Sequence, residues 1–236
     1  MNLIVDSGNT NVKAGLFADG QLQEVYRQIP LSQLLELIKK TAPENLLISS
    51  VSDLNPDRFQ FPSVKKMLVM RYTLPMPIQI LYKTPETLGT DRIAGAVAAK
   101  MLFPDLPCLV IDAGTCITYN FVNAQSHYFG GAISPGVKMR FKALNTFTAR
   151  LPLVEMDEKS SLIGGNTRES IISGVVNGVV AEVEGIIARY RTEFPEIKIL
   201  VTGGDATFFE TKIKEPIFVV PDLVLKGLNR ILEYNI

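Results

Sequence analysis

The sequence predicts a mixed α/β protein built from two copies of one plan. Residues 3–10 (LIVDSGNT) return at residues 109–116 (LVIDAGTC), and each copy is followed by another strand-like run. Strand-like and helix-like runs then alternate through both halves of the chain. Three consecutive aliphatic residues are typical of a strand buried on both faces. Each copy therefore predicts a hairpin whose aspartate, Asp6 or Asp112, lies where the strand leaves the core.

The first half is expected to contain several strands and two helices. Strands are predicted at residues 2–6, 12–18 and 21–29, with Asp19-Gly20 as the tight turn before the third. Apolar residues at 31, 34, 35 and 38 predict a helix, followed by strands at 46–51, 68–70 and 78–82. A second helix is predicted at 90–103, where apolar residues again recur at helical spacing.

The second half repeats this order. Strands are predicted at 109–112, 117–122 and 128–134, a loop running into a helix at 135–147, and a long helix at 167–191. A strand at 197–202, a Gly-Gly turn into a helix, a strand at 217–220 and a helix at 222–234 complete the chain. No low-complexity linker separates the halves, and we expect domains at 1–103 and 104–236.

Composition narrows the function classes. The 236 residues suit two domains, and lysine plus arginine equals aspartate plus glutamate at 24 each, so no nucleic-acid or anionic-membrane surface is indicated. No apolar run is long enough to predict a membrane span, and no signal-like segment opens the sequence. Cys108, Cys116 and His127 are interpreted as structural residues of a protein in the reducing cytoplasm.

The two hairpin turns predict a site for nucleotide phosphates. A glycine in each turn lets the backbone come close to a ligand, and the turns carry hydroxyl and amide side chains. Their N–H groups suit phosphate oxygens, and Asp6 and Asp112 suit a cation. One such turn alone is equally an ordinary hairpin. Lys13, just beyond the first turn, either contacts phosphate or points to solvent.

A second candidate site is Gly89-Thr90-Asp91-Arg92 at the start of the helix predicted from residue 90. The plain interpretation is helix capping, with Thr90 as N-cap and Asp91 favourable to the helix dipole. The functional interpretation gives Asp91 a catalytic role. Arg92 supplies a planar cation for a substrate carboxylate, or pairs with a nearby acid.

Six motifs in order resemble the type III pantothenate kinases. They are DSGNTNVK (6–13), GTDR (89–92), DAGT (112–115), GGAISPG (130–136), NTRES (166–170) and TGGD (202–205). This family is part of the actin, heat-shock chaperone and sugar-kinase superfamily, which implies an α/β fold of two duplicated ribonuclease-H-like domains with an ATP cleft between them. The resemblance implies ATP-dependent phosphorylation of pantothenate to 4'-phosphopantothenate, the first step of coenzyme A biosynthesis.

The resemblance also implies roles for individual residues. Asp91 is the expected catalytic base, Asp112 the ligand of a monovalent cation (potassium or ammonium), and Asp6 the carboxylate nearest the magnesium that accompanies ATP. The ATP-binding residues are then Asp6, Ser7, Gly8, Asn9, Thr10, Asn11, Val12, Lys13 and Thr115. Those that bind pantothenate are Tyr82, Gly89, Thr90, Asp91, Arg92 and Thr167.

A homodimer is expected, because the apolar residues of the helix at 167–191 cover more than one narrow stripe and family members are dimers. Its seam is predicted near residues 174–180. Two other interpretations stay open. One is a kinase or phosphatase of the same superfamily acting on another small molecule. The other is a non-catalytic regulator, which the zero net charge and the intact Asp91 speak against.

Overall fold

The computed structural model describes residues 1–7, 12–50, 61–157 and 160–236. These residues divide into two compact units. Unit 1 comprises residues 1–104, 126–129 and 222–236, and unit 2 comprises residues 105–125 and 130–221. The predicted turn residues Gly8, Asn9, Thr10 and Asn11 lie outside the described residues.

Unit 1 holds a five-stranded sheet in the order β3-β2-β1-β4-β5. β1 pairs antiparallel with β2 and parallel with β4, as two strands of a hairpin and a crossover require. The elements of this part of the chain are β1 (Asn2–Ser7), β2 (Val12–Ala18), β3 (Gln21–Arg27), α1 (Leu31–Thr41), β4 (Asn45–Ser50), β5 (Lys66–Val69), β6 (Gln79–Ile80), a 3-10 turn (Pro85–Thr87) and α2 (Thr90–Leu102).

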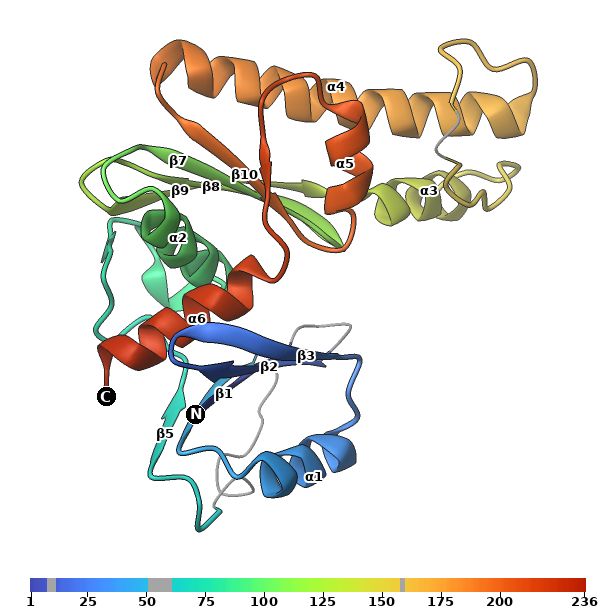
Figure 1. Cartoon of the computed structure of the whole chain (residues 1–236). Helices are drawn as coiled ribbons and strands as arrows, with labels where there is room; N and C mark the ends of the chain where they lie inside the picture. The colour runs from blue at the N-terminus through green and yellow to red at the C-terminus, as the bar shows by residue number, and fades with distance from the viewer. Residues whose placement is uncertain (8–11, 51–60, 158–159) are drawn as a thin grey trace. The chain divides into compact units, whose positions relative to one another are not determined.

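Side-chain alternation along β1 separates two layers in unit 1. Leu3 and Val5 pack with Leu34 and Ile38 of α1 in one apolar cluster, which covers the first face. Ile4 and Asp6 point to the opposite face, which packs against α6 (Leu223–Tyr234). α6 and α2 lie side by side in this unit (Figure 1).

The crossing of α2 and α6 depends on Gly227. A Cβ at Gly227 would lie 1.9 Å from the carbonyl oxygen of Ala94, so only glycine permits this approach. α6 thus belongs to unit 1, whereas the sequence placed residues 222–236 in a domain spanning 104–236. The physical reason is that the apolar side of α6, with Leu225, Leu228 and Ile231 fully or almost fully buried, covers the β1–β4 face.

Unit 2 repeats the hairpin plan with β7 (Cys108–Ala113) in the place of β1. β7 pairs antiparallel with β8 (Cys116–Val122) and parallel with β10 (Lys198–Thr202). The second sheet has the order β11-β10-β7-β8-β9-β6, with β9 at His127–Pro135 and β11 at Phe218–Val219. His127 and Tyr128, which pair with β6, count with unit 1. The duplicated sheets confirm the predicted α/β fold class.

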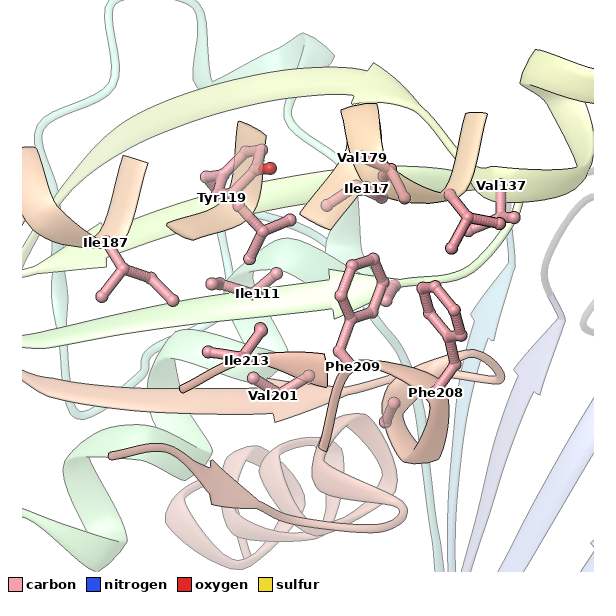
Figure 2. Close-up of a cluster of buried hydrophobic side chains, with 14 of the residues drawn as sticks. Ile111, Ile117, Tyr119, Val137, Val179, Ile187, Val201, Phe208, Phe209 and Ile213 are labelled. Carbon is pink, nitrogen blue, oxygen red and sulfur yellow. The ribbon is translucent and has the colours of Figure 1, made fainter. Parts of the chain in front are cut away.

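Three helices supply the core of unit 2. α3 (Val137–Thr146), α4 (Thr167–Glu193) and α5 (Ala206–Lys212) pack side chains onto one face of β7, β8 and β10. Figure 2 shows Val179 and Ile187 of α4 and Phe208 and Phe209 of α5 in this cluster. Among the described residues, α4 alone is long and apolar enough to pass a test for a membrane span, a test that core helices also pass.

Each predicted strand and helix is present in the described residues, with ends shifted by a few residues. One capping expectation differs from the structure: Gly89, and not Thr90, is the N-cap of α2. Asn166 caps α4, where its side chain accepts a hydrogen bond from the Glu169 N–H at 3.0 Å. Cys108 and Cys116 are not joined by a disulfide.

Candidate active site

Asp6 lies at the end of β1, between two polar side chains placed by strand register. Lys13 of β2 is its antiparallel partner, and Ser49 of β4 is its parallel partner. Residues in register on neighbouring strands project from the same face, so the three side chains form one row. This places Lys13 beside Asp6, and a contact between Lys13 and phosphate stays a prediction.

The Asp6 carboxylate is buried beside a second carboxylate. Burial, followed by the charge of Asp91, raises the pKa of Asp6 to about 6. The Lys13 charge and a hydrogen bond from Ser49 act in the opposite direction. Asp6 and Asp91, which are far apart in the sequence, therefore lie close enough in unit 1 for their charges to interact.

This arrangement fits a divalent cation, because a positive charge near two neighbouring carboxylates, one of them desolvated, stabilises both. Mg²⁺ keeps most of its waters and needs only one or two carboxylates. In the described parts of the chain, no three His, Cys, Asp or Glu side chains gather into a metal-binding group. The donor set therefore suits a magnesium ion that arrives with a phosphate ligand.

Thr90 and Asp91 are the first two residues of α2, and the contacts of their side chains are not those of a simple N-cap. The Thr90 hydroxyl shares a 2.9 Å hydrogen bond with Ser49 of β4, and no side chain caps the helix. The Asp91 carboxylate accepts from the Arg92 N–H at 2.8 Å. A Cβ at Gly89 would lie 2.5 Å from this carboxylate, so a larger residue at position 89 would displace the Asp91 carboxylate from this hydrogen bond.

Arg92 and Tyr82 are brought together in the same unit. The Arg92 guanidinium carbon lies 5.9 Å from the centre of the Tyr82 ring, within the range of a cation–π contact. Only 7% of Arg92 is exposed, and Tyr82 also lies against Tyr128 with ring centres 6.4 Å apart. The two predicted substrate contacts are thus neighbours. One face of the Arg92 guanidinium already packs against the Tyr82 ring.

Asp112 occupies in unit 2 the place that Asp6 occupies in unit 1. Its register partners are Thr118 of β8 and Thr202 of β10. The next residue, Gly203, has a φ of 96°, and a Cβ there would lie 2.4 Å from an Asp112 carboxylate oxygen. The Asp205 N–H donates to the Ala113 carbonyl oxygen at 2.9 Å, which fixes the Gly-Gly turn beside the hairpin. A carboxylate between two threonines supplies oxygen ligands of the kind that hard cations take.

The turn of this hairpin, which contains Thr115, is held by backbone contacts. The Gly114 N–H donates to the Cys116 carbonyl at 2.9 Å, and the Gly136 N–H donates to the Thr115 carbonyl at 3.1 Å. A Cβ at Gly136 would lie 2.2 Å from the Gly114 oxygen. The motif at 130–136 therefore serves to bring the start of α3 directly against the turn.

Sequence reasoning missed a polar cluster around Glu182 of α4. One Glu182 oxygen accepts from the Tyr119 hydroxyl at 3.0 Å and from the Ser134 hydroxyl at 2.6 Å, and the other pairs with Arg140 at 2.5 Å. Arg140 also donates to the Pro135 carbonyl at 2.8 Å, next to Gly136. The cluster links four elements to the segment that holds the Thr115 turn. An acid among the apolar residues of the long helix was the available signal.

The predicted site residues divide between the two units. Unit 1 holds Asp6, Ser7, Val12, Lys13, Tyr82 and the Gly89–Arg92 segment, and unit 2 holds Asp112, Thr115 and Thr167. Ser7 and Val12 form the β1–β2 pair nearest to the connecting residues 8–11. Thr167 is exposed on the first turn of α4, next to a polar pocket lined by Asp157, Ser160, Ser161, Arg168, Glu169, Ile172 and Lys212.

The fold of two sheets, each with an acidic hairpin, is shared with solved structures that include sugar kinases. A glucokinase from an Antarctic psychrotroph (TM-score 0.54, 13% identity, 98% of both chains) and a putative 2-dehydro-3-deoxygalactonokinase from Sinorhizobium meliloti (TM-score 0.61, 13% identity, 98% of both chains) share it. A putative Baf family transcriptional activator from Campylobacter jejuni also has this fold (TM-score 0.66, 22% identity, 99% of this chain and 98% of that chain).

The sequence comparisons identify the family. The family model described as type III pantothenate kinase matches residues 2–189. Type III pantothenate kinases from Cytophaga hutchinsonii and Phocaeicola vulgatus are 45% and 44% identical, over 100% of this chain and 100% and 99% of theirs. The chain belongs to the type III pantothenate kinase family, enzymes that phosphorylate pantothenate in coenzyme A biosynthesis.

The Glu182 cluster predicts a pH-dependent contribution to stability. Burial alone would raise the pKa of Glu182, but hydrogen bonds from Ser134, Arg140 and Tyr119 outweigh it, and the pKa is lowered. The stabilisation is thus complete above the ordinary glutamate pKa and is lost as the pH falls through the lower folded value. We expect Glu182→Gln to reduce the free energy of unfolding by about 1 kcal/mol at pH 7, because the cluster is partly exposed to solvent.

Chemical denaturation at pH 7 and at pH values below 4.5 measures this effect. The difference between wild type and Glu182→Gln should narrow with acid. Glu44→Gln is the matched control: it removes an exposed ion pair with Lys65 and should change the stability by less than about 0.5 kcal/mol. A Glu182 difference that stays constant over this pH range would contradict the assignment.

Proposed function

We propose that this protein transfers the γ-phosphoryl group of ATP to a hydroxyl of pantothenate, with Asp91 as the residue that orients that hydroxyl. One observation carries the assignment of residues. Asp6 and Asp91, from the phosphate motif and the substrate motif, lie within electrostatic reach of one another in unit 1. A phosphate-side carboxylate and a substrate-side carboxylate are thus held by one rigid packing of β1, β4 and α2.

The proposed step is a direct displacement. The pantothenate hydroxyl oxygen forms a bond to the γ-phosphorus while the bond from that phosphorus to the bridging oxygen of ADP breaks, and the hydroxyl proton passes to the Asp91 carboxylate. Phosphoryl transfer through a loose transition state needs orientation of the nucleophile more than early removal of its proton. The hydrogen bond from the Arg92 N–H to the Asp91 carboxylate supports this role by fixing the carboxylate's direction.

ATP binding is assigned to the two hairpins. Ser7 to Lys13 and Thr115 would donate hydrogen bonds to the phosphates, and Asp6 would hold the magnesium that neutralises them. The register that places Lys13 beside Asp6 supports this assignment, because the lysine adds a positive charge next to the proposed phosphate site. Tyr82, the Gly89–Arg92 segment and Thr167 would hold pantothenate.

A monovalent cation, potassium or ammonium, is proposed at Asp112. It would add positive charge near the phosphates without the rigid octahedral shell of magnesium. The threonines on either side of Asp112 in the sheet support an oxygen-rich site. Cys108 and Cys116 are not joined by a disulfide, which supports the cytoplasmic location that we propose.

A homodimer is proposed with its seam on α4. Gly174 and Gly178 lie one turn apart on the exposed side of this helix, and a Cβ on either would meet no other atom within 4 Å. Two apolar side chains just before α4 are also exposed: Leu162 is 82% and Ile163 is 83% exposed. A bare helix face beside exposed apolar residues supports close packing against a second copy.

A substitution tests the role proposed for Asp91. Asp91→Asn should reduce turnover by roughly 10²- to 10⁴-fold, the usual contribution of one acid–base group. The asparagine oxygen still accepts from the Arg92 N–H, so the melting temperature should change little. The measurement is phosphate transfer from ATP to pantothenate at saturating substrates. Asp19→Asn, in an exposed turn of the same unit, is the control and should behave as wild type. More than about half of wild-type turnover in folded Asp91→Asn would remove Asp91 from the mechanism.

Potassium dependence tests the Asp112 site. Activity should be low in sodium-only buffer and should rise to saturation with potassium or ammonium. Asp112→Asn should weaken that activation, because the site loses its anionic ligand. If Asp112 only holds the hairpin together, the variant will be less stable but will keep the potassium response. Potassium titrations of both proteins, with folding checked by circular dichroism, separate these cases. Equal wild-type activity in sodium and in potassium would refute the assignment.

Sedimentation measures the proposed dimer. The 26.0 kDa chain should sediment at twice its mass, and Gly178→Arg should shift it toward the monomer by placing a long charged side chain in the seam. Gln33→Arg, on the exposed side of α1, is the matched control and should leave the mass unchanged. A 26.0 kDa wild-type species with full specific activity would exclude a functional dimer.

A further inference from the structure

Ser49 joins the two halves of the candidate site in unit 1, although neither interpretation of the sequence gave it a role. It is 1% exposed and lies on β4 in register with Asp6 of β1. Its hydroxyl hydrogen-bonds the Asp6 carboxylate and lies 2.9 Å from the Thr90 hydroxyl. Asp6, Ser49 and Thr90 therefore form a continuous chain from the phosphate motif to the substrate motif.

The direction of this chain follows from counting protons. An ionised carboxylate only accepts hydrogen bonds, and a serine hydroxyl has one proton to donate. Ser49 therefore donates to Asp6, and its oxygen accepts from Thr90. The single hydroxyl proton of Thr90 is then already used. On its remaining side, Thr90 presents only acceptor lone pairs.

We propose that Ser49 is a positioning residue that fixes the Thr90 hydroxyl as a hydrogen-bond acceptor, so that the substrate presents a hydroxyl or amide N–H at Thr90. A carboxylate or phosphate oxygen is itself an acceptor, and it meets an unfavourable lone pair at this point. Pantothenate carries hydroxyl, amide and carboxylate groups. The chain therefore sets the direction in which pantothenate lies, with its carboxylate away from Thr90.

This inference rests on the proposed function, because it takes Thr90 as a substrate contact. It adds a role for a residue that touches neither ATP nor pantothenate. It also adds a reason for Thr90 to lie inside the first turn of α2, where its hydroxyl reaches β4, in place of the N-cap position.

The test is a double-mutant cycle with Ser49→Ala and Thr90→Val, read by calorimetric binding of pantothenate and by steady-state kinetics. Ser49→Ala releases the Thr90 proton, and we expect the pantothenate Kd and KM to rise roughly fivefold to tenfold, the value of one neutral hydrogen bond. In the Thr90→Val background, the same Ser49 change should alter the pantothenate Kd less than about twofold, because Ser49 acts through Thr90. Ser49→Ala also removes a hydrogen bond from Asp6, and any loss of kcat from that change should be the same with Thr90 and with Thr90→Val.

Several controls keep the result decisive. Thr41→Val removes a hydroxyl that donates to the Leu37 carbonyl at 2.8 Å in the same unit, and it should leave the pantothenate Kd and the kinetics unchanged. If Ser49→Ala does not fold, Ser49→Cys keeps the size of the side chain with a much weaker donor and gives the same comparison. Equal fold-changes in both Thr90 backgrounds, or an unchanged pantothenate Kd in Ser49→Ala, would overturn the proposal. A wild-type protein that transfers no phosphate to pantothenate would instead refute the proposed function.

Discussion

The fold of each unit depends on one constraint: a carboxylate that ends a buried strand needs polar partners from both neighbouring strands. Asp6 is flanked in register by Lys13 and Ser49, and Asp112 by Thr118 and Thr202. Strand pairing therefore also positions the site residues, because a register slip of one residue would turn each carboxylate to the other face of its sheet. The row of polar side chains forms only when the carboxylate strand pairs with its hairpin partner on one side and with a parallel strand on the other.

The cost of burying Asp6 explains its neighbours. A desolvated carboxylate beside Asp91 is held only because a lysine and a serine hydroxyl compensate part of its charge. The same environment favours a bound cation and discourages other anions unless a cation accompanies them. The row of Lys13, Asp6 and Ser49 thus has the electrostatic property that phosphate transfer in a type III pantothenate kinase needs: it favours an anion that brings its own cation.

Much of this architecture could be predicted from the sequence, because short-range patterns determine it. The aliphatic triplets, the periodic helices and the small-residue turns each specify their element locally. The partners of Ser49 and Glu182 could not be found in this way, since strand register and helix packing between distant segments set them; for Glu182 the sequence showed only an acid within an apolar helix. Thr90 was expected at the N-cap position because sequence shows which residue caps well, but not that β4 supplies a competing partner.

The return of α6 to unit 1 has a consequence for biosynthesis. The sheet face that carries Ile4 and Asp6 packs against a helix encoded at residues 223–234, more than a hundred residues after the strands that it covers. During synthesis, β1, β2 and β4 leave the ribosome with this apolar face uncovered, and it stays uncovered until the last helix has been made. Unit 1 is thus complete only after residues 223–234 have been made, and apolar surface exposed until then is of the kind that aggregates while a chain grows.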